Sequence, residues 1–526
     1  MKDNDTILKS NQLRKTDELF AKQAPSQSGF WEYVCRENRV YSLVILGLMI
    51  LQFTVFKLLY PFPDFFSDSY SYIFAAYAHL DVNIWPIGYS RFLSIFHFFT
   101  YSGTALVFFQ YLFFSVSGLY FYHTIAYFYH TGKNTRIFLC LFLFFNPLFL
   151  YLANYVTSDM LFVSMSILWI SQLIWILHRP TLYQVFVQAI LMFIMFTFRY
   201  NAMIYPLIAA GVFLISKQNI WVKVAGVVAG PLLILPFVIF SSQATKRMTG
   251  TAQFPPILGG WQWGNNALYM REYIELDSTK FPTPETAELD RIAREYFRRV
   301  PPKYRDLPNY VANFFIRQSE APLKQYLARH YKPKSGYEDV VAWGKAAVVF
   351  DQYGKYLIKQ HPFAFAQHYL LVNVKNYFIP PLEKLEIYNL GLDEMWLMGQ
   401  IWFHYPVPKV RSISKELQGT VLALFPAFFL GLNLYYFISL LFFIRRTWGK
   451  KRNENIRYTI LMTTTFIGIN FAFSVFANII VIRYQIFPML VFLTFSMLLT
   501  DYVELFSHSA AGENVRLYNC RSAVLK

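Results

Sequence analysis

The chain of 526 residues is 55% hydrophobic and 20% aromatic, has a mean hydropathy of +0.31 and carries a net charge of +17. Long apolar runs of this composition exclude an ordinary soluble enzyme and predict an all-α integral membrane protein that crosses the bilayer several times. The positive charge does not indicate nucleic-acid binding, because the basic residues lie mainly in tails and short loops, where membrane topology accounts for them.

About ten segments are apolar enough to cross a bilayer, whose core requires roughly 20 apolar residues per helix. They cover residues 40–60, 103–129, 136–156, 160–178, 183–199, 202–215, 222–241, 417–444, 457–481 and 485–506. The sixth segment is short, so the sequence leaves open whether it crosses the membrane completely.

Basic residues between these segments set the predicted orientation, because positively charged loops stay on the cytosolic side. If the N-terminus is cytosolic, all the basic clusters fall on that side: Lys2, Lys9, Arg14, Lys15, Lys22, Arg36, Arg39, Lys133, Arg136, His178, Arg179, Lys217, Lys223, Arg445, Arg446, Lys450, Lys451, Arg452 and Arg457. We expect both termini to be cytosolic. The sequence shows no retention signal or eukaryotic accessory domain, which favours a bacterial inner (plasma) membrane.

This topology divides the chain into a membrane core, a large extracytoplasmic insert and two cytosolic tails. The predicted units are a cytosolic tail (1–39), a seven-span core (40–241) with an outer loop (61–102), a mainly helical extracytoplasmic insert (242–415), three C-terminal spans (416–506) and a cytosolic tail (507–526). The units that we expect outside the cytosol are therefore the outer loop, the insert and short turns between spans.

Apolar residues recur at helical spacing in the outer loop and in the insert. In the outer loop they predict two helices that lie on the membrane surface or pack against neighbouring helices. In the insert, Thr283-Pro284-Glu285 is typical of a helix start, and further helices are expected over 308–331, 338–360 and 362–378. Proline and glycine at Phe254–Gly260 predict an irregular segment before them.

Three aspartates follow or separate predicted spans on the outer side. Asp64 and Asp68 come directly after the first span, and Asp159 lies in a very short turn before the fourth. Apolar flanks raise the proton affinity of a carboxylate and a nearby arginine lowers it, a balance that a catalytic base can use. Alternatively, Asp68 caps a helix that starts at Ser69 and Asp159 caps the fourth span.

Two Arg-Tyr pairs, Arg199-Tyr200 and Arg483-Tyr484, lie at the outer ends of long apolar helices. Positive residues are expected mainly on the cytosolic side, so two arginines on the outer side require an explanation. A guanidinium stays charged when partly desolvated and forms paired hydrogen bonds with phosphate oxygens. The alternative for each arginine is snorkelling to the membrane surface or an ion pair with an outer aspartate.

Four short motifs on the outer side, taken in order, resemble a known family. They are Asp68-Ser69-x-x-Tyr72 with Trp85-Pro86-Ile87-Gly88-Tyr89, Ser158-Asp159-Met160-Leu161-Phe162, Arg199-Tyr200 with Pro206, and Arg483-Tyr484 with Pro488. Together they resemble the lipid-sugar-dependent glycosyltransferases of the GT-C superfamily, close to the protein mannosyltransferase and aminoarabinose transferase branch. The resemblance covers roughly residues 40–506.

The resemblance implies a transferase that moves a sugar from a polyprenyl-phosphate donor to a hydroxyl acceptor at the outer face of the membrane. It implies Asp68 as the catalytic base, with Asp64 as the nearby competitor, and Asp159 as a residue that supports the site or orients the acceptor. The usual acid in the second motif is a glutamate, so Asp159 reaches one methylene less far. The sequence identifies neither the sugar nor the acceptor, which is a glycan, a lipid or a protein.

The resemblance also implies that Arg199 and Arg483 hold the donor phosphate and stabilise the charge that develops on it. Their neighbours Tyr200 and Tyr484 are expected at the same substrate site. In the insert, the glycine-rich and aromatic run that contains Trp261 and Asn265 has a composition suited to stacking on a sugar, although a plain anchoring loop fits equally well.

No cofactor is firmly implied. His79 and Asp81 lie near Asp68, but they lack a recognised ligand spacing, so a divalent metal stays open. The main alternative function is a lipid or solute transporter or flippase, which more often places ionisable groups at mid-membrane or in repeated broken helices. A third alternative makes the insert a binding platform that the spans merely anchor.

Overall fold

A computed structural model describes residues 29–276, 280–331, 336–447 and 454–524, and the regular elements in these ranges are all helices. Several basic residues used for the orientation lie outside the described residues: Lys2, Lys9, Arg14, Lys15, Lys22, Lys450, Lys451 and Arg452. Side chains of the predicted C-terminal tail are likewise outside the described set, although helix α24 continues to Val524.

Within the described ranges, eight helices are long and apolar enough to cross a membrane. Four of these spans are single helices: Arg39–Leu59 (α3), Gly103–Phe128 (α6), Asp159–His178 (α9) and Ile220–Thr249 (α12). Two combine a pair of helices: Lys133–Asn154 contains α7 (Lys133–Phe144) and α8 (Pro147–Asn154), and Leu417–Arg446 contains α21 (Leu417–Leu422) and most of α22 (Phe425–Thr447). The last two are parts of longer helices: Asn455–Ala477 lies in α23 (Glu454–Ala477) and Ile486–Leu505 lies in α24 (Ile486–Val524). Two further apolar helices, α10 (Tyr183–Phe198) and α11 (Tyr205–Ile215), are shorter. The multi-pass character therefore rests on eight helices rather than on all ten predicted spans.

The third predicted span is a broken helix, and its sequence explains the break. Asn146 caps α8, because its side-chain oxygen accepts a hydrogen bond from the backbone N–H of Leu148 at 3.0 Å. Pro147 follows at the first helical position, where its missing N–H costs nothing. The chain can therefore end α7 and restart as α8 with the N–H of Leu148 paired at the new helix start.

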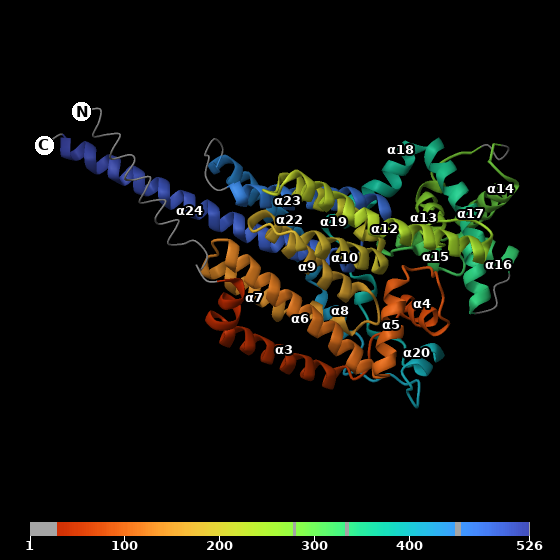
Figure 1. Ribbon diagram of the computed structural model, residues 1–526. Coiled ribbons are helices and arrows are strands. Elements are labelled where there is room, and N and C mark those ends of the chain that lie inside the picture. Colours follow the sequence, from red (N-terminus) through yellow and green to blue (C-terminus); the bar gives the residue numbers. More distant parts are fainter. Residues whose placement is uncertain (1–28, 277–279, 332–335, 448–453, 525–526) are drawn as a thin grey trace.

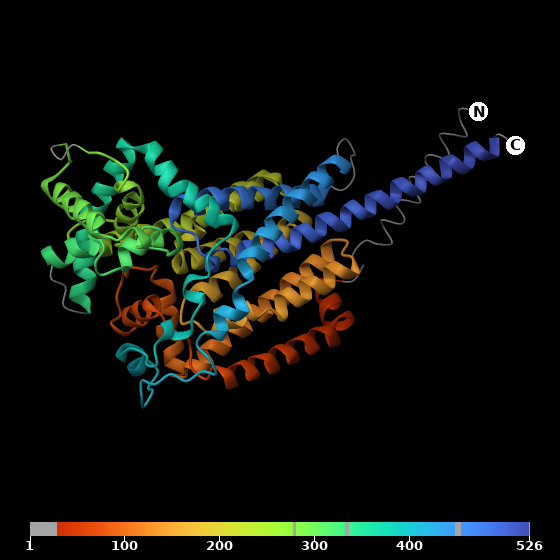
Figure 2. The same cartoon turned by 180° about the vertical axis from the view of Figure 1, so that it is seen from behind.

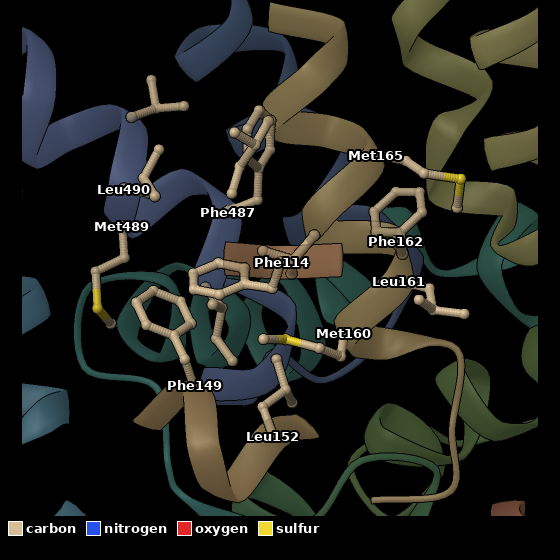
Figure 3. Packing of buried hydrophobic residues seen from close by; sticks show 14 of the residues in the cluster. Phe114, Phe149, Leu152, Met160, Leu161, Phe162, Met165, Phe487, Met489 and Leu490 are labelled. Atoms are coloured by element: carbon tan, nitrogen blue, oxygen red, sulfur yellow. The ribbon is translucent and has the colours of Figure 1, made fainter. Parts of the chain in front are cut away.

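Helix α9 lies at the centre of the membrane bundle. Its most apolar stretch is 83% buried, against 22% for α3 at the periphery. Figure 3 shows side chains of four helices meeting here, with Phe114 of α6, Phe149 of α8, Met160 of α9 and Phe487 of α24 in one cluster. The N-terminus of α9, which carries Asp159, is thereby held in a fixed position.

The outer loop forms two helices, α4 (Ser67–Tyr77) and α5 (Gly88–Phe99), which pack on each other. Ile73 and Leu93 are fully buried, whereas Phe98 and Phe99 at the end of α5 are largely exposed. Packing against neighbours therefore accounts for α4, and α5 combines a packed face with an exposed apolar one. Both helices lie at the end of the molecule opposite the C-terminal half of α24 (Figure 1).

The insert forms a helical layer at this same end, which we call the insert face (Figures 1 and 2). Its helices are α13 (Leu258–Arg271), α14 (Pro284–Arg299), α15 (Phe314–Arg317), α16 (Pro322–Tyr331), α17 (Tyr337–Gln360), α18 (Pro362–Phe365) and α19 (Leu371–Phe378). The expected start of α14 is present, because the Thr283 side chain caps the N–H of Thr286 at 3.3 Å. Helix α12 runs on to Thr249, past the predicted end of the seventh span at 241.

The glycine-rich run of the insert is helix α13, so the prediction of an irregular segment is wrong from Leu258 onward. Gly260 and Gly264 lie four residues apart and share one face of α13, which packs on α17. A Cβ atom on Gly260 would lie 1.9 Å from the carbonyl oxygen of Ala347. The glycines therefore permit close helix packing rather than a flexible loop.

Residues 379–415, the last part of the insert and here called the return segment, lead from α19 back to α21 across the insert face. They contain the short turns Glu383–Leu385 and Tyr388–Gly391 and the helix α20 (Leu397–Trp402), which packs on α4. The ring of Trp396 stacks on Tyr70 of α4 at 4.4 Å between centroids. This segment carries polar side chains to the N-termini of α4 and α9.

Replacing Gly260 with alanine should destabilise the insert, because the added methyl group has no room against the α17 backbone. Overpacking of this kind costs about 1–3 kcal/mol, which would lower the thermal unfolding midpoint of the detergent-solubilised protein. Gly468→Ala is the matched control, since nothing lies within 4 Å of a Cβ atom there. Equal midpoints for the two variants would contradict the packing described.

Candidate functional site

Two buried carboxylates stand at helix N-termini on the insert face. Asp68 lies in the first turn of α4 and Asp159 is the first residue of α9, with side chains about 10% and 5% exposed. Neither is the N-cap, since Phe66 and Ser158 hold those positions. The capping alternative is therefore wrong for both residues, while the helix dipole still favours their negative charge.

Two arginines from distant turns converge on Asp159. Arg199, directly after α10, forms an ion pair with one carboxylate oxygen, and Arg483, in the turn before α24, lies 3.5 Å from the other. Arg483 also lies 3.4 Å from Asp68. The expected alternative of an ion pair with an outer aspartate is thus realised for both arginines, and Arg483 joins the two carboxylates.

The return segment adds a lysine and a glutamate to this group. The ammonium of Lys384 donates hydrogen bonds to both oxygens of Asp68, at 3.0 and 2.9 Å. Glu383 pairs with Arg317 at 2.6 Å and lies 3.8 Å from Arg483. Four basic and three acidic side chains therefore form one network, which carries one excess positive charge when all are ionised.

Opposing effects set the protonation of Asp68. Burial alone would raise the pKa of this carboxyl, but the adjacent Lys384 and Arg483 lower its pKa to about 2. Burial lowers the pKa of Lys384 to about 8 against the opposing effect of Asp68. Asp68 and Lys384 are therefore both charged at neutral pH, and Asp68 is a weak base as long as its cations stay in place.

The network forms one wall of a cavity of about 290 Å³ between the membrane helices and the insert. We call Asp68, Asp159, Arg199 and Arg483 the charged wall; among the residues that the structure describes, no other Asp, Glu, Lys or Arg lines the cavity. Tyr200 and Tyr484 line it as well. Six of the nine residues that the sequence selected thus share one cavity.

The remaining wall is neutral and comes from the insert and from the turn between α23 and α24. The amide side chains from these two parts, here called the amide wall, are Gln262, Asn266, Asn313, Asn478 and Gln485; a sixth lining amide, Asn201, follows directly on Arg199-Tyr200. Trp85 and Trp263 add aromatic surface, and Met203 and Phe476 line the cavity while remaining 43% and 47% exposed. The cavity thus combines charge, amides and an apolar rim.

Asp64 does not line the cavity, although it is only four residues from Asp68. Its backbone N–H donates to Asn154 O at 2.8 Å, and its carbonyl accepts from the N–H of Val156 at 3.2 Å. One carboxylate oxygen accepts from the backbone N–H of Asn389 at 2.8 Å. Asp64 therefore joins the outer loop to the turn before α9 and to the return segment.

Trp261 and Asn265 also lie away from the cavity, on the opposite face of α13. Trp261 is fully buried and stacks on Trp343 at 4.1 Å, and the Asn265 side-chain oxygen accepts from the N–H of Phe315 at 3.1 Å. Their neighbours Gln262, Trp263 and Asn266 face the cavity instead. The glycine-rich run does contribute to the cavity, but through Gln262, Trp263 and Asn266 rather than through the predicted Trp261 and Asn265.

His79 and Asp81 do not form a metal site. Asp81 pairs with Arg91 at 3.2 Å and Arg247 at 3.8 Å, away from the cavity. In the described ranges, no group of three or more His, Cys, Asp or Glu side chains could hold a metal ion.

Sequence reasoning missed Lys384 and Glu383, because both lie in the insert, far along the chain from the spans. One signal was available: they follow the break Pro380-Pro381, and apolar residues flank them. The backbone explains their position, since the N–H of Ile482 donates to Pro381 O at 2.9 Å and ties the return segment to the Arg483 turn.

Comparison of the chain with protein-family models, with curated proteins and with solved structures returns no match. The function must therefore be argued from the geometry of the cavity.

Lys384→Met should destabilise the protein strongly, because it removes the main partner of the buried Asp68 carboxylate. Breaking a buried pair on one side costs about 3–5 kcal/mol. The double variant Asp68→Asn/Lys384→Met should recover most of that loss, since no unpaired charge remains. Thermal unfolding of the three variants in detergent measures the coupling, and additive losses would show that the two side chains do not interact.

Asp64 should make stability depend on pH. Burial raises its pKa from 3.8 to about 8, so between these values the unfolded chain releases a proton that the folded chain retains. Stability should therefore fall as pH rises from about 4 to about 8. Asp64→Asn, which keeps an acceptor for the Asn389 N–H, should flatten this part of the unfolding curve and raise the midpoint at pH 8 relative to the wild type.

The matched control is Asp81→Asn, because Asp81 is about half exposed. Its pH profile should follow that of the wild type. An Asp64→Asn profile parallel to the wild type between pH 5 and 8 would contradict a protonated, buried Asp64.

Proposed function

We propose that this protein is a membrane glycosyltransferase of the GT-C type, which moves a sugar from a polyprenyl-phosphate donor to a hydroxyl acceptor. In this proposal the insert face is the extracytoplasmic side of a bacterial inner membrane. One observation carries it: Asp68, Asp159, Arg199 and Arg483, from four separate turns, contact one another along the wall of a single cavity.

The position of the cavity suits a substrate with a lipid tail. Met203, in the turn Tyr200–Ile204 before α11, and Phe476, at the end of α23, line the cavity and are substantially exposed. Both lie beside apolar helices of membrane character. A prenyl chain could remain among the apolar helices while its phosphate reaches the charged wall.

The arginines and Lys384 supply the charge that a donor phosphate needs. Guanidinium groups bind phosphate oxygens in pairs and stay ionised when water is excluded. The network carries one excess positive charge, so an arriving anion improves its charge balance. In our proposal the phosphate takes the contact that Arg483 makes with Asp68 in its absence, while Asp159 keeps its contacts with Arg483 and Arg199.

This exchange would also activate Asp68. Asp68 loses the contact with Arg483 and keeps Lys384, and a buried carboxylate with one cation fewer gains affinity for protons, because less positive charge opposes the effect of burial on its pKa. Asp68 takes the proton of the acceptor hydroxyl, whose oxygen forms a bond to the anomeric carbon of the sugar. The bond between that carbon and the phosphate oxygen breaks, and polyprenyl phosphate leaves with the electron pair, stabilised by the arginines.

Asp159 acts in this scheme by holding both arginines. Its carboxylate contacts Arg199 and Arg483, and the Thr157 hydroxyl donates to it at 3.1 Å. The carboxylate therefore keeps the two guanidinium groups side by side, facing the cavity. We regard it as a positioning residue.

The transporter or flippase alternative has less support. In the described membrane-length helices, the Asp, Glu, Lys and Arg residues lie near the helix ends, as at Lys57, Asp159 and Asp501. Transport sites more often use ionisable groups near mid-membrane. The cavity likewise lies beside helix ends rather than midway along them.

Sugar transfer from radiolabelled polyprenyl-phosphate donors, measured in membranes that contain the full chain, tests the proposal. Asp68→Asn should lower the transfer rate by about 10²–10⁴-fold, which is the usual contribution of a general base. Arg483→Ala should raise the donor concentration needed for half-maximal rate and lower that rate as well. Asp81→Asn, in the same outer loop but away from the cavity, should retain wild-type transfer.

Full transfer by Asp68→Asn would remove Asp68 as the base. Failure of the wild type to consume any donor, combined with movement of lipid across the bilayer, would replace the transferase by a flippase. The expression level and unfolding midpoint of each variant must be measured alongside, so that a folding defect is not mistaken for a catalytic one.

A further inference from the structure

The amide wall differs in chemistry from the charged wall of the same cavity. The side chains of Gln262, Asn266, Asn313, Asn478 and Gln485 are all neutral and each offers both hydrogen-bond donors and an acceptor. They come from α13, from the turn before α15, and from the turn between α23 and α24. Such a set matches ligand hydroxyl groups, which also donate and accept.

Part of the amide wall is held in place by its own hydrogen bonds. Gln262 donates to the side-chain oxygens of Asn266 at 2.8 Å and Asn478 at 3.3 Å, and Asn266 donates to Ala477 O at 3.1 Å. These bonds join α13 of the insert to the end of α23. The wall is therefore preorganised, and ligand binding need not order it.

Two other amides have buried atoms that find no hydrogen-bond partner among the described residues. They are the side-chain oxygen of Asn313 and both amide atoms of Gln485, and the two residues are 5% and 0% exposed. Buried polar atoms are nearly always paired, because each unpaired one costs about 1–3 kcal/mol. Both residues line the cavity, but these atoms have no accessible surface, so they pair with a ligand hydroxyl only after their side chains turn toward the cavity.

We propose that the amide wall is the sugar subsite and that it selects a neutral, polyhydroxylated sugar over amino sugars and uronic acids. This inference rests on the proposed function, which brings the donor phosphate to the charged wall of the same cavity. The reacting carbon then lies between the two walls, with the ring hydroxyls toward the amides.

Selectivity follows from the absence of a counter-ion. The amide wall carries no charge; in the donor complex that we propose, the phosphate and Asp159 pair with the arginines, and Asp68 stays paired with Lys384. An ammonium or carboxylate on the sugar would be desolvated against neutral amides, which is costly for a charged group. A sugar that lacks the ring hydroxyls facing the amide wall would also bind weakly, because the buried amide groups would then have no hydrogen-bond partner.

Donor binding to the detergent-solubilised full chain tests the inference, with the shift of the thermal unfolding midpoint as readout. Four probes share one prenyl chain: polyprenyl phosphate without sugar, and its conjugates with glucose, with a 4-amino pentose and with a hexuronic acid. The glucose conjugate should bind at least about tenfold more tightly than either charged conjugate.

Gln485→Met separates ligand binding from a structural role. Methionine has a similar length, and no described protein hydrogen bond of the amide group is lost. The unfolding midpoint without ligand should stay equal or rise, whereas affinity for the glucose conjugate should fall about 2–10-fold, as expected for lost hydrogen bonds. Affinity for polyprenyl phosphate itself should not change.

Asn313→Asp should reverse the selectivity, because it places a carboxylate in the amide wall. Asn313 has a left-handed backbone with φ of 57°, which aspartate also tolerates. This variant should bind the amino-sugar conjugate more tightly and the glucose conjugate more weakly than the wild type. Asn309→Asp, in the preceding turn and away from the cavity, should leave both affinities unchanged.

The outcomes distinguish the two proposals. If polyprenyl phosphate and its conjugates all fail to shift the midpoint, both the proposed function and the subsite fall. If polyprenyl phosphate binds and the three sugars bind equally, or a charged one binds best, the transferase proposal stands and the neutral-sugar subsite is overturned.

Discussion

The arrangement of the insert face depends on one buried ion network. Asp68 and Asp159 lie at the N-termini of helices from the outer loop and the membrane core, and neither carboxylate could be buried without cationic partners. Arg199 and Arg483 come from turns between apolar helices, and Lys384 comes from the return segment. The electrostatic requirement of two carboxylates therefore brings together four parts of the chain.

Around this network, each neighbouring feature has a positioning role. The close contact of α13 with α17 fixes the helix that supplies Gln262 and Asn266, and the Trp396–Tyr70 stack holds the return segment against α4. Asp64 joins the outer loop to the turn before α9 by backbone hydrogen bonds. The cavity is consequently bounded by parts that are each held in place independently, which suits a site that must align two substrates.

The sequence was most informative where a physical rule acts locally. Apolar length located the membrane helices to within a few residues in most cases, and Thr283-Pro284 located the start of α14. The charges at span ends selected Asp68, Asp159, Arg199 and Arg483, because charge beside a bilayer requires a partner or a task. The sequence predicted that these four residues lie on the same side of the membrane helices. It did not show that their side chains contact one another.

Predictions failed where long-range packing decided the outcome. The glycines of α13 looked like loop residues because their packing partner, Ala347, lies far along the chain. In the resulting helix, Trp261 and Asn265 point into the core of the insert, and their neighbours Gln262, Trp263 and Asn266 line the cavity. The composition of the run could not determine which residues take which side. Lys384 was missed for a related reason, since nothing local connects residue 384 with Asp68.

The separation of these partners along the chain has a consequence for biogenesis. Asp68 is 316 residues from Lys384 and 415 residues from Arg483, so its carboxylate emerges from synthesis long before either cation exists. The outer loop cannot adopt its final buried state until the return segment has been made, and the network closes only when the turn before α24 arrives. A nascent chain that stops before this turn therefore has an incomplete site, and synthesis of the turn that carries Arg483 supplies its last member.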